Sequence, residues 1–396
     1  MKDTTSGKLT AIFESNFTGH RSMYISHLMR YINDSSSLHH KFIFILPKGM
    51  REMLGVLADS SKYTLEFVEF QRTKSNSVLR SFEEWKWLRD AIKKYPAINK
   101  IIFMEVDSYL ILISSSRFKK LGLKVIGILF QPYIHFKEIK GGLDFQLRKI
   151  WKNFLFQKYA LVRNKNIEQL FIINDTESIN ILNRRLKEIF NNIPDPIETH
   201  KQDLDESFVR HILKKYDIDD NQKNLLVFGS IDSRKNLKTI IDALLLLPEE
   251  IRKNIHLIIS GKFASDIRTS YLDYIDKHKN ELSVAYNDDF VGEAEREIIF
   301  QNCHLVLMPY INFYSASSVI GHAISYNKNI VAPNKGLLAK IVRLNKLGLN
   351  VNPHNAVEIK DAVLTLLSES TYFSYDGEKL IDEYNPANFS KILLSN

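Results

Sequence analysis

The sequence predicts an α/β protein made of two Rossmann-like, doubly wound domains that face each other across a cleft. A chain of 396 residues exceeds one ordinary domain and fits two of moderate size. Short apolar runs alternate with longer segments of helical periodicity, and this alternation occurs twice. Between the two series, residues 191–202 carry two prolines and no apolar periodicity, which predicts a connector.

Each series supplies a set of candidate strands. Several of them are apolar without alternation, as expected for strands covered on both faces of a parallel sheet. The first set lies at 9–13, 42–46, 64–70, 101–104, 125–130 and 171–174. The second set lies at 225–228, 256–260, 283–286, 305–308, 329–332 and 349–351.

The intervening segments predict helices and complete the domain plan. Apolar residues from Leu237 to Leu245 have helical spacing, and the pattern ends near Pro248. We therefore expect an N-terminal domain at 1–196 and a C-terminal domain at 197–371. The tail, 372–396, predicts a helix that packs across both domains.

Composition excludes several classes of protein. The first ten residues lack the apolar core of a secretion signal, and no apolar run approaches the ~20 residues that span a bilayer. Cys303 is the only cysteine, which excludes an intrachain disulfide and favours the cytoplasm. The net charge of +8 has no concentrated basic block, so nucleic acid is not an expected partner.

Residues 148–159 form a basic, aromatic-rich helical pattern with two interpretations. Such a helix can lie on an anionic membrane, at the inner face of the cell membrane. The aromatic residues can equally be core and the lysines its solvated face. The acidic pairs Asp288 with Asp289 and Glu105 with Asp107 are of a kind common on surfaces, and no metal is predicted.

The loop after the strand at 225–228 predicts a phosphate site. It runs from Gly229 and Ser230 to Arg234 and Lys235, just before a helix. A helix N-terminus carries partial positive charge, so two cations there conflict unless an anion binds. Arg234 can grip a phosphate in bidentate fashion and Lys235 can act as a point charge. Alternatively, both side chains are solvated and the carboxylate of Asp232 compensates part of their positive charge.

The loop after the strand at 305–308 predicts a second part of that site. Ser315, Ser317 and Ser318 precede a helix that continues through Val319. Free backbone N–H groups and hydroxyls at a helix start bind phosphate without a charged side chain. Ordinary N-capping accounts for one serine and leaves the others free.

Four segments resemble a known family: FGSIDSRKNLKTIIDAL, HLIISG, LVLMPYINFYSASSVIGHAISYNKNIVAPNKGLL and GLNVNPHN. They resemble the C-terminal half of family 4 glycosyltransferases, which are retaining enzymes of the GT-B fold that need no metal. The similarity covers most of 224–367. It implies that Lys235 contacts the donor diphosphate and that 315–319 hold its phosphates and sugar.

The sequence departs from the family pattern at three positions. The family has two glutamates eight positions apart, the later of which holds the ribose, where this chain has Tyr314 and His322. The imidazole of His322 can still hydrogen-bond a ribose hydroxyl. The arginine that often follows the strand glycine is Ser230 here, and Arg234 is its expected substitute.

Two loops of the first half carry the predicted catalytic residues, His20 and His135. Gly19 and His20 follow the strand at 9–13 and resemble the glycine loop of the N-terminal GT-B domain, where Gly19 lets the backbone approach a ligand. His135 follows the strand at 125–130, near where the family places a histidine against the transferred sugar. The alternatives are a solvated turn histidine at 20 and a packed one at 135.

The sequence thus predicts a glycosyltransferase that moves a sugar from a nucleotide-sugar donor to a glycan or lipid-linked glycan acceptor. The expected context is synthesis of cell-surface polysaccharide or glycoconjugates, with retention implied by the resemblance. No cofactor is expected beside the substrate. The alternatives are a nucleotide-sugar epimerase or hydrolase on the same fold, and a non-catalytic scaffold or partner subunit.

Overall fold

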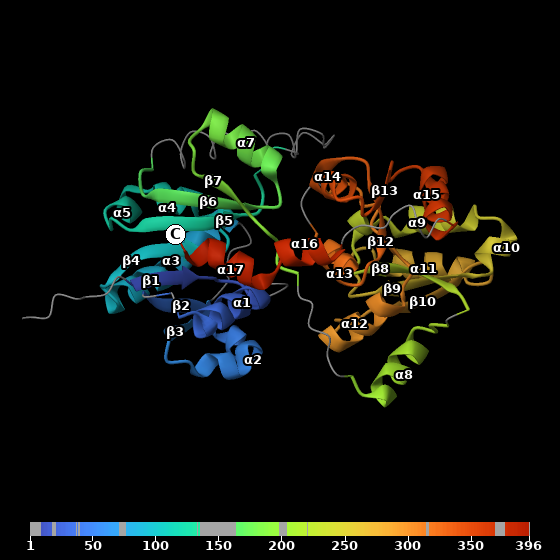
Figure 1. Cartoon of the computed structure of the whole chain (residues 1–396), viewed down its shortest axis with the longest axis horizontal. Helices are drawn as coiled ribbons and strands as arrows, with labels where there is room; N and C mark the ends of the chain where they lie inside the picture. The colour runs from blue at the N-terminus through green and yellow to red at the C-terminus, as the bar shows by residue number, and fades with distance from the viewer. Residues whose placement is uncertain are drawn as a thin grey trace, which may run out of the picture. The chain divides into compact units, whose positions relative to one another are not determined.

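The computed structural model describes residues 9–17, 21–36, 38, 40–70, 77–132, 134, 164–197, 204–219, 221–313, 317–368 and 377–395. The chain divides into two compact units, which can be followed in Figure 1 by the colour that runs from blue at the N-terminus to red at the C-terminus. The first unit comprises Met1–Pro196 with Pro386–Asn396, and the second comprises Ile197–Asn385.

The first unit is built on a parallel sheet of seven strands in the order β3-β2-β1-β4-β5-β6-β7. Each strand pairs in parallel with its neighbours, for example Ile12 with Phe44 on one side and Ile102 on the other. The strands are β1 (Leu9–Phe13), β2 (Lys41–Pro47), β3 (Tyr63–Val68), β4 (Ile98–Phe103), β5 (Lys124–Leu129), β6 (Ile167–Ile173) and β7 (Phe190–Ile193).

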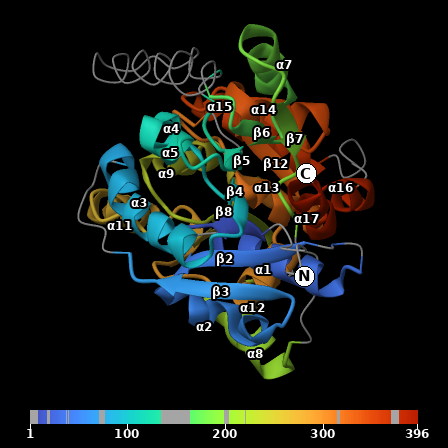
Figure 2. The same cartoon turned by 90° about the vertical axis from the view of Figure 1, so that its left-hand side faces the viewer.

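Both faces of this sheet are buried, which explains why its strands are apolar without alternation. Successive β2 residues enter two separate cores: Phe44 packs on one face and Ile45 on the other. Figure 2 shows α3, α4 and α5 on one side of the sheet and α17 on the other. The helical segments are α1 (Arg21–Asp34), η1 (Lys48–Met50), α2 (Arg51–Leu54), η2 (Gly55–Asp59), α3 (Ser77–Lys94), η3 (Asp107–Tyr109), α4 (Leu110–Ser114), α5 (Ser116–Lys119), α7 (Thr176–Arg185) and α17 (Pro386–Leu394).

The second unit repeats this plan with a parallel sheet of six strands in the order β10-β9-β8-β11-β12-β13. All six residues of β9 are buried, and successive residues such as Ile258 and Ile259 enter different cores. The strands are β8 (Lys223–Phe228), β9 (Ile255–Ser260), β10 (Ser283–Asn287), β11 (Leu305–Leu307), β12 (Asn329–Pro333) and β13 (Gly348–Val351).

The helices of the second unit also cover both faces of its sheet. One core includes residues of α9, α11 and α15, and the other includes residues of α8, α12, α13, α14 and α16. The helical segments are α8 (Glu206–Lys215), η6 (Ser233–Lys235), α9 (Leu237–Leu245), α10 (Glu249–Arg252), α11 (Arg268–His278), α12 (Glu293–Asn302), α13 (Ser318–Ser325), α14 (Gly336–Leu344), α15 (Ala356–Ser368) and α16 (Gly377–Glu383).

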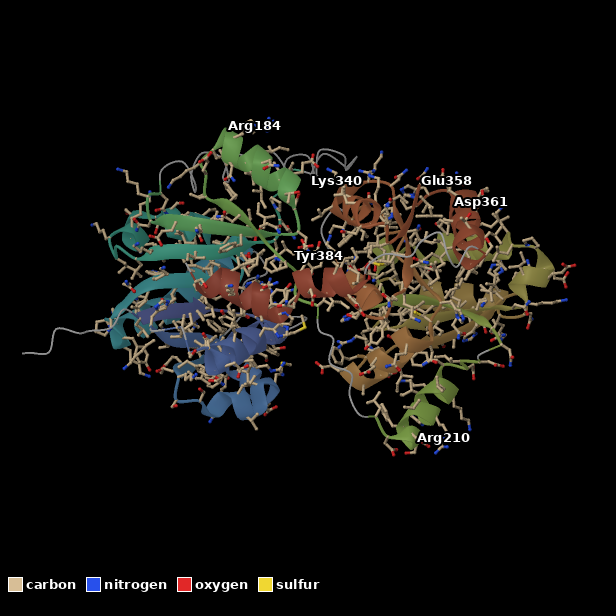
Figure 3. All side chains as sticks on the ribbon, in the orientation of Figure 1. Arg184, Arg210, Lys340, Glu358, Asp361 and Tyr384 are labelled. Carbon is tan, nitrogen blue, oxygen red and sulfur yellow. The ribbon has the colours of Figure 1, made fainter. Side chains whose placement is uncertain are left out.

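The tail, expected as one helix over 372–396, forms two helices in its described part. The helix α16 packs on α13 of the second unit, and the carbonyl of Tyr384, labelled in Figure 3, accepts a hydrogen bond from the Ile197 amide at 2.7 Å. After Asn385, α17 packs on α1 of the first unit. There Phe389 is fully buried, and its ring centroid lies 4.9 Å from that of Tyr24.

The expected strands are all present, and one further strand was missed. The predicted runs correspond to β1 to β6 and β8 to β13, with ends that differ by a few residues. The missed strand, β7, has the sequence FNNI and lies at the start of the predicted connector. Its two asparagines are exposed and only Phe190 and Ile193 are buried, so no apolar run marks it.

Candidate functional site

The topology of the second sheet fixes where its ligand site is expected. From β8, the chain adds β9 and β10 on one side and places β11, β12 and β13 on the other. In open parallel sheets, ligands bind beyond the carboxyl ends of the strands at such a switch point. The loops that follow β8 and β11 are therefore the relevant segments, and they carry the basic and serine-rich motifs.

Glycines let the loop after β8 approach its neighbours closely. Gly229 has φ of 97°, and a Cβ there would lie 3.5 Å from Nζ of Lys235 and 3.9 Å from Cγ2 of Val319. Gly261, after β9, has φ of 139°, and a Cβ there would lie 2.1 Å from the Gly229 carbonyl oxygen. Side chains at these two positions would be strained by backbone conformation, and at Gly261 also by a direct clash.

A short turn then orients the basic pair. The Asp232 carboxylate accepts a hydrogen bond from the Arg234 amide at 3.1 Å and caps η6. Asn236 follows in the left-handed conformation with φ of 61°. Its side-chain amide donates to the carbonyls of Pro309 at 3.1 Å and Pro353 at 2.5 Å. The turn is thereby joined to the segments that follow β11 and β13.

Lys235 is buried at the carboxyl edge of the sheet, with 2% of its surface exposed. Its Nζ donates to the Phe228 carbonyl at 2.5 Å and to the Tyr310 hydroxyl at 2.6 Å. Burial, reinforced by the positive charge of Arg234, lowers the pKa of Lys235 from 10.5 to about 7. Among the described residues, no carboxylate forms an ion pair with this amine.

Tyr310 contacts that amine with both its hydroxyl and its ring. Its ring centroid lies 4.3 Å from Nζ of Lys235. Burial raises the pKa of Tyr310 far above 10, so the phenol stays neutral. A neutral hydroxyl both donates and accepts hydrogen bonds, so it can serve either protonation state of the lysine.

Arg234 lies beside Lys235 but is more exposed. Its Nε contacts Asp232 Oδ2 at 3.0 Å, and its guanidinium carbon lies 5.1 Å from the Phe313 ring centroid. The side chain is 38% exposed, so the Asp232 pair contributes little to stability. The two contacts fix the guanidinium next to the loop that follows β11.

The start of α13 completes the cluster. Ser317 is the N-cap residue, but its side chain makes no capping hydrogen bond, which leaves the helix start open to other acceptors. Ser318 is the first helical residue, and Val319 is buried. His322 lies one turn later, and its ring packs against Phe228 at 6.2 Å and Phe300 at 5.5 Å between centroids.

The structure brings most of the predicted donor-side residues together. Gly229 lies close to both Lys235 and Val319, and Arg234 precedes Lys235 in the chain. Ser230, in contrast, is exposed. The sequence placed two cations at the start of a helix. In the structure, they belong to η6, and the left-handed Asn236 separates them from α9. Gly19, His20, His135 and Ser315 lie outside the described residues.

Sequence reasoning missed two residues of this site, Tyr310 and Asn236. Tyr310 follows β11 directly after Met308 and Pro309, a pattern that looks like ordinary strand termination. Asn236 follows the basic pair, and asparagine is enriched in the left-handed conformation. The left-handed turn at Asn236 could therefore have been predicted from the residue type. The Lys235–Tyr310 contact joins residues 75 positions apart and could not be predicted from a local sequence pattern.

The first unit has its own switch point, between β1 and β4. Glu14 follows β1, and its carboxylate pairs with Nη1 of Arg21 at 3.2 Å. The same nitrogen lies 3.4 Å from the Met104 carbonyl, and the guanidinium carbon lies 4.4 Å from the Phe130 ring centroid. Burial raises the pKa of Glu14 from 4.5 to about 7, although Arg21 opposes the shift.

A second buried carboxyl lies at this edge. Asp107 accepts hydrogen bonds from the amides of Phe130 and Gln131, each at 2.9 Å, and so fixes the segment that follows β5. Burial and the charge of Glu105 raise the pKa of Asp107. Glu105 itself accepts a hydrogen bond from the Ser108 amide at 2.8 Å. Glu14, Glu105 and Asp107 therefore lie near one another at this edge, and Glu14 is paired with Arg21.

The acidic pairs have structural partners. Asp288 accepts from the Phe263 amide at 2.8 Å and pairs with Arg268. In the described part of the chain, no three His, Cys, Asp or Glu side chains are grouped as a metal site would require. None of the helices among the described residues is long and apolar enough to span a bilayer. The basic aromatic stretch at 148–159 lies outside the described residues.

Comparison with known proteins links the second unit to a known family. Residues 209–380 match the family of group 1 glycosyl transferases, and this segment contains every described residue of the Lys235 cluster. The second unit is therefore similar to this family over most of its length. No curated protein sequence matches the chain significantly.

Solved structures match over nearly the full length and show the GT-B fold. WaaG, a glycosyltransferase involved in lipopolysaccharide biosynthesis, aligns with a TM-score of 0.68 and 15% identity over 98% of this chain and 100% of its own. HepE of Anabaena, in complex with UDP and glucose, has a TM-score of 0.69 and 13% identity over 98% of both chains. The lipopolysaccharide outer core galactosyltransferase WaaB has a TM-score of 0.62 and 15% identity over 98% and 99%.

Proposed function

We propose that this protein transfers a sugar from a nucleotide-sugar donor to a glycan or lipid-linked glycan acceptor, in the synthesis of cell-surface polysaccharide or glycoconjugates. The observation that carries the proposal is Lys235, a buried amine with no described carboxylate partner at the switch point of a unit that matches the group 1 glycosyl transferase family. A diphosphate supplies the missing negative charge. The complex of HepE with UDP and glucose is consistent with such a donor.

The roles of the residues follow from their positions. Lys235 and Arg234 would hold the diphosphate, with backbone groups at Gly229 and Ser230 beside it. The start of α13, at Ser315, Ser317, Ser318 and Val319, would face phosphate or sugar, and His322 would contact the ribose.

The chemistry requires stabilisation of a leaving diphosphate. The bond from the anomeric carbon to phosphate breaks and its electron pair leaves on the diphosphate. The acceptor hydroxyl oxygen forms the new glycosidic bond, and its proton passes to the leaving diphosphate. Positive charge and helix N–H groups that are already in place stabilise the leaving group without reorganisation. We propose that His20 and His135 are catalytic, that Gly19 lets the backbone approach the donor, and that the anomeric configuration is retained.

The cellular setting is part of the same proposal. An acceptor linked to lipid would be met at the inner face of the cell membrane by a cytoplasmic enzyme. The basic aromatic stretch at 148–159 is our candidate for peripheral contact with anionic lipid.

The test is thermal unfolding with UDP, GDP, ADP and CMP, for the wild type and for the double variant Arg234→Ala with Lys235→Ala. A ligand at 100 times its dissociation constant adds about 2.7 kcal/mol to the free energy of unfolding. We expect one nucleotide to stabilise the wild type and to leave the double variant unchanged. Lys253→Ala, which removes an exposed ion pair with Glu249, is the matched control and should respond like the wild type.

A non-catalytic scaffold is the second candidate, and the surroundings of His322 favour it. At the position where family 4 enzymes hold the ribose with a glutamate, the structure has an imidazole packed against the rings of Phe228 and Phe300. If no nucleotide stabilises the wild type, the scaffold replaces the transferase. Product analysis with and without acceptor separates a transferase from an epimerase or hydrolase, which needs no acceptor.

A further inference from the structure

The surroundings of Lys235 have an unusual charge balance. Its two hydrogen-bond partners, the Phe228 carbonyl and the Tyr310 hydroxyl, are both neutral oxygens. In the same turn, the positive charge of Arg234 disfavours the ammonium form of Lys235. The carboxylate of Asp232 is already paired with Arg234. The start of α13 presents Val319 and Ser317, which do not ionise. The ammonium form is therefore buried without a counter-ion of its own.

Such an arrangement holds the lysine near the balance between its two protonation states. Burying an ammonium without a paired anion is costly, and the amine responds by releasing its proton. The pKa of Lys235, lowered to about 7 by burial, reflects this balance in the free protein. An anion placed against Nζ restores the charged form, so binding and protonation must be linked.

Tyr310 is suited to keep Nζ in place in both states. Its hydroxyl can accept from the ammonium and can donate to the neutral amine, which the Phe228 carbonyl cannot do. A carboxylate at this position would instead neutralise the lysine and repel a phosphate.

We propose that Tyr310 is a positioning residue for Lys235, and that occupation of this site by the diphosphate of a nucleotide sugar takes up a proton from solvent onto the Lys235 amine. This inference rests on the proposed function, because it assumes that the diphosphate binds here. The step forms one N–H bond on Lys235, breaks one bond to hydrogen in the solvent or buffer acid that gives up the proton, and changes no covalent bond of the ligand.

The test is calorimetric titration with UDP-glucose, or with the nucleotide sugar selected by the unfolding experiment, in buffers of different ionisation enthalpy. The diphosphate of a nucleotide sugar has no group that titrates near neutrality, so the slope of measured enthalpy against buffer ionisation enthalpy reports protons taken up by the protein. We expect uptake approaching one proton at pH about 8.5 and close to none at pH about 5.5.

Variants separate the two parts of the proposal. Lys235→Arg keeps a cation that does not titrate and should abolish the uptake. Tyr310→Phe should shift the pH midpoint of uptake downward and weaken binding about tenfold, the loss of a hydrogen bond to a charged group. Tyr310→Gln restores a group that donates and accepts, and should move the midpoint back. Lys328→Met removes another lysine, which donates to the Gln301 carbonyl at 2.8 Å, and should change neither quantity.

Each outcome has a definite meaning. Binding without proton uptake at pH about 8.5 overturns the linkage, and an unchanged midpoint in Tyr310→Phe overturns the role of the tyrosine. Failure of every nucleotide and nucleotide sugar to bind overturns the proposed function itself. The wild-type titration decides the linkage even if one variant fails to fold.

Discussion

The two units place opposite charges at equivalent points of similar sheets. At the switch point between β8 and β11, the second unit buries an amine whose partners are neutral oxygens. At the switch point between β1 and β4, the first unit buries the carboxyl groups of Glu14 and Asp107, with Glu105 near both and Arg21 paired with Glu14. The same scaffold thus supports an edge that favours an anion and an edge that favours hydrogen-bond donors or cations.

The difference also predicts opposite responses to pH. The lysine has a folded-state pKa below its ordinary value, so it destabilises the protein at low pH and ceases to do so as pH rises from about 7 toward 10.5. Glu14 has a folded-state pKa above its ordinary value, so its contribution is lost as pH rises from 4.5 toward about 7.

The largest expected effect comes from the tail. Phe389→Ala removes a fully buried ring that contacts Tyr24 in the core of the first unit. Truncation of such a side chain costs about 3–5 kcal/mol. We expect hydrogen exchange, followed by mass spectrometry, to show lost protection in β1 to β7 but not in β8 to β13.

The control for this prediction is Val357→Ala, which truncates a half-exposed residue of α15 in the second unit. It should change the free energy of unfolding by less than about 0.5 kcal/mol. Equal loss of protection in both sheets of Phe389→Ala would show that the units do not unfold separately, and the comparison between them would lose its basis.

The next effect concerns Lys235 in the absence of ligand. Lys235→Met replaces a buried amine by an apolar side chain of similar length and should stabilise the free protein by about 1–3 kcal/mol at pH about 6. The gain should shrink at pH about 9, where the wild-type amine is neutral. Chemical denaturation at the two pH values measures both, and an equal effect at both would contradict the charge argument.

The smallest effect is expected at the acidic edge. Glu14→Gln keeps a hydrogen-bonding side chain beside Arg21 but removes the titration. Between pH about 4.5 and 7, the wild type should lose about 1–2 kcal/mol relative to this variant. Melting temperature against pH is the measurement. Glu206→Gln, at an exposed residue of α8, is the control and should follow the wild type, whereas parallel profiles for Glu14→Gln and the wild type would refute the prediction.

The sequence by itself determined the strands, the parallel α/β class and the location of the basic pair. Strands such as β2 and β9 are apolar along their length because both faces are covered, and that pattern is local. The strand β7 was not predicted, because its two central residues are exposed asparagines. The resemblance of 224–367 to family 4 glycosyltransferases was likewise carried by local motifs, and the group 1 family match over 209–380 agrees with it.

Only the tertiary structure decided how the site is balanced. The partner of Lys235 is Tyr310, 75 positions away, and the loop after β13 enters through the bond from Asn236 to Pro353. The tail likewise divides at Asn385, because Leu380 belongs to one core and Phe389 to another. Periodicity reports which residues are buried, whereas the identity of a buried partner depends on contacts between distant segments, which no local pattern encodes.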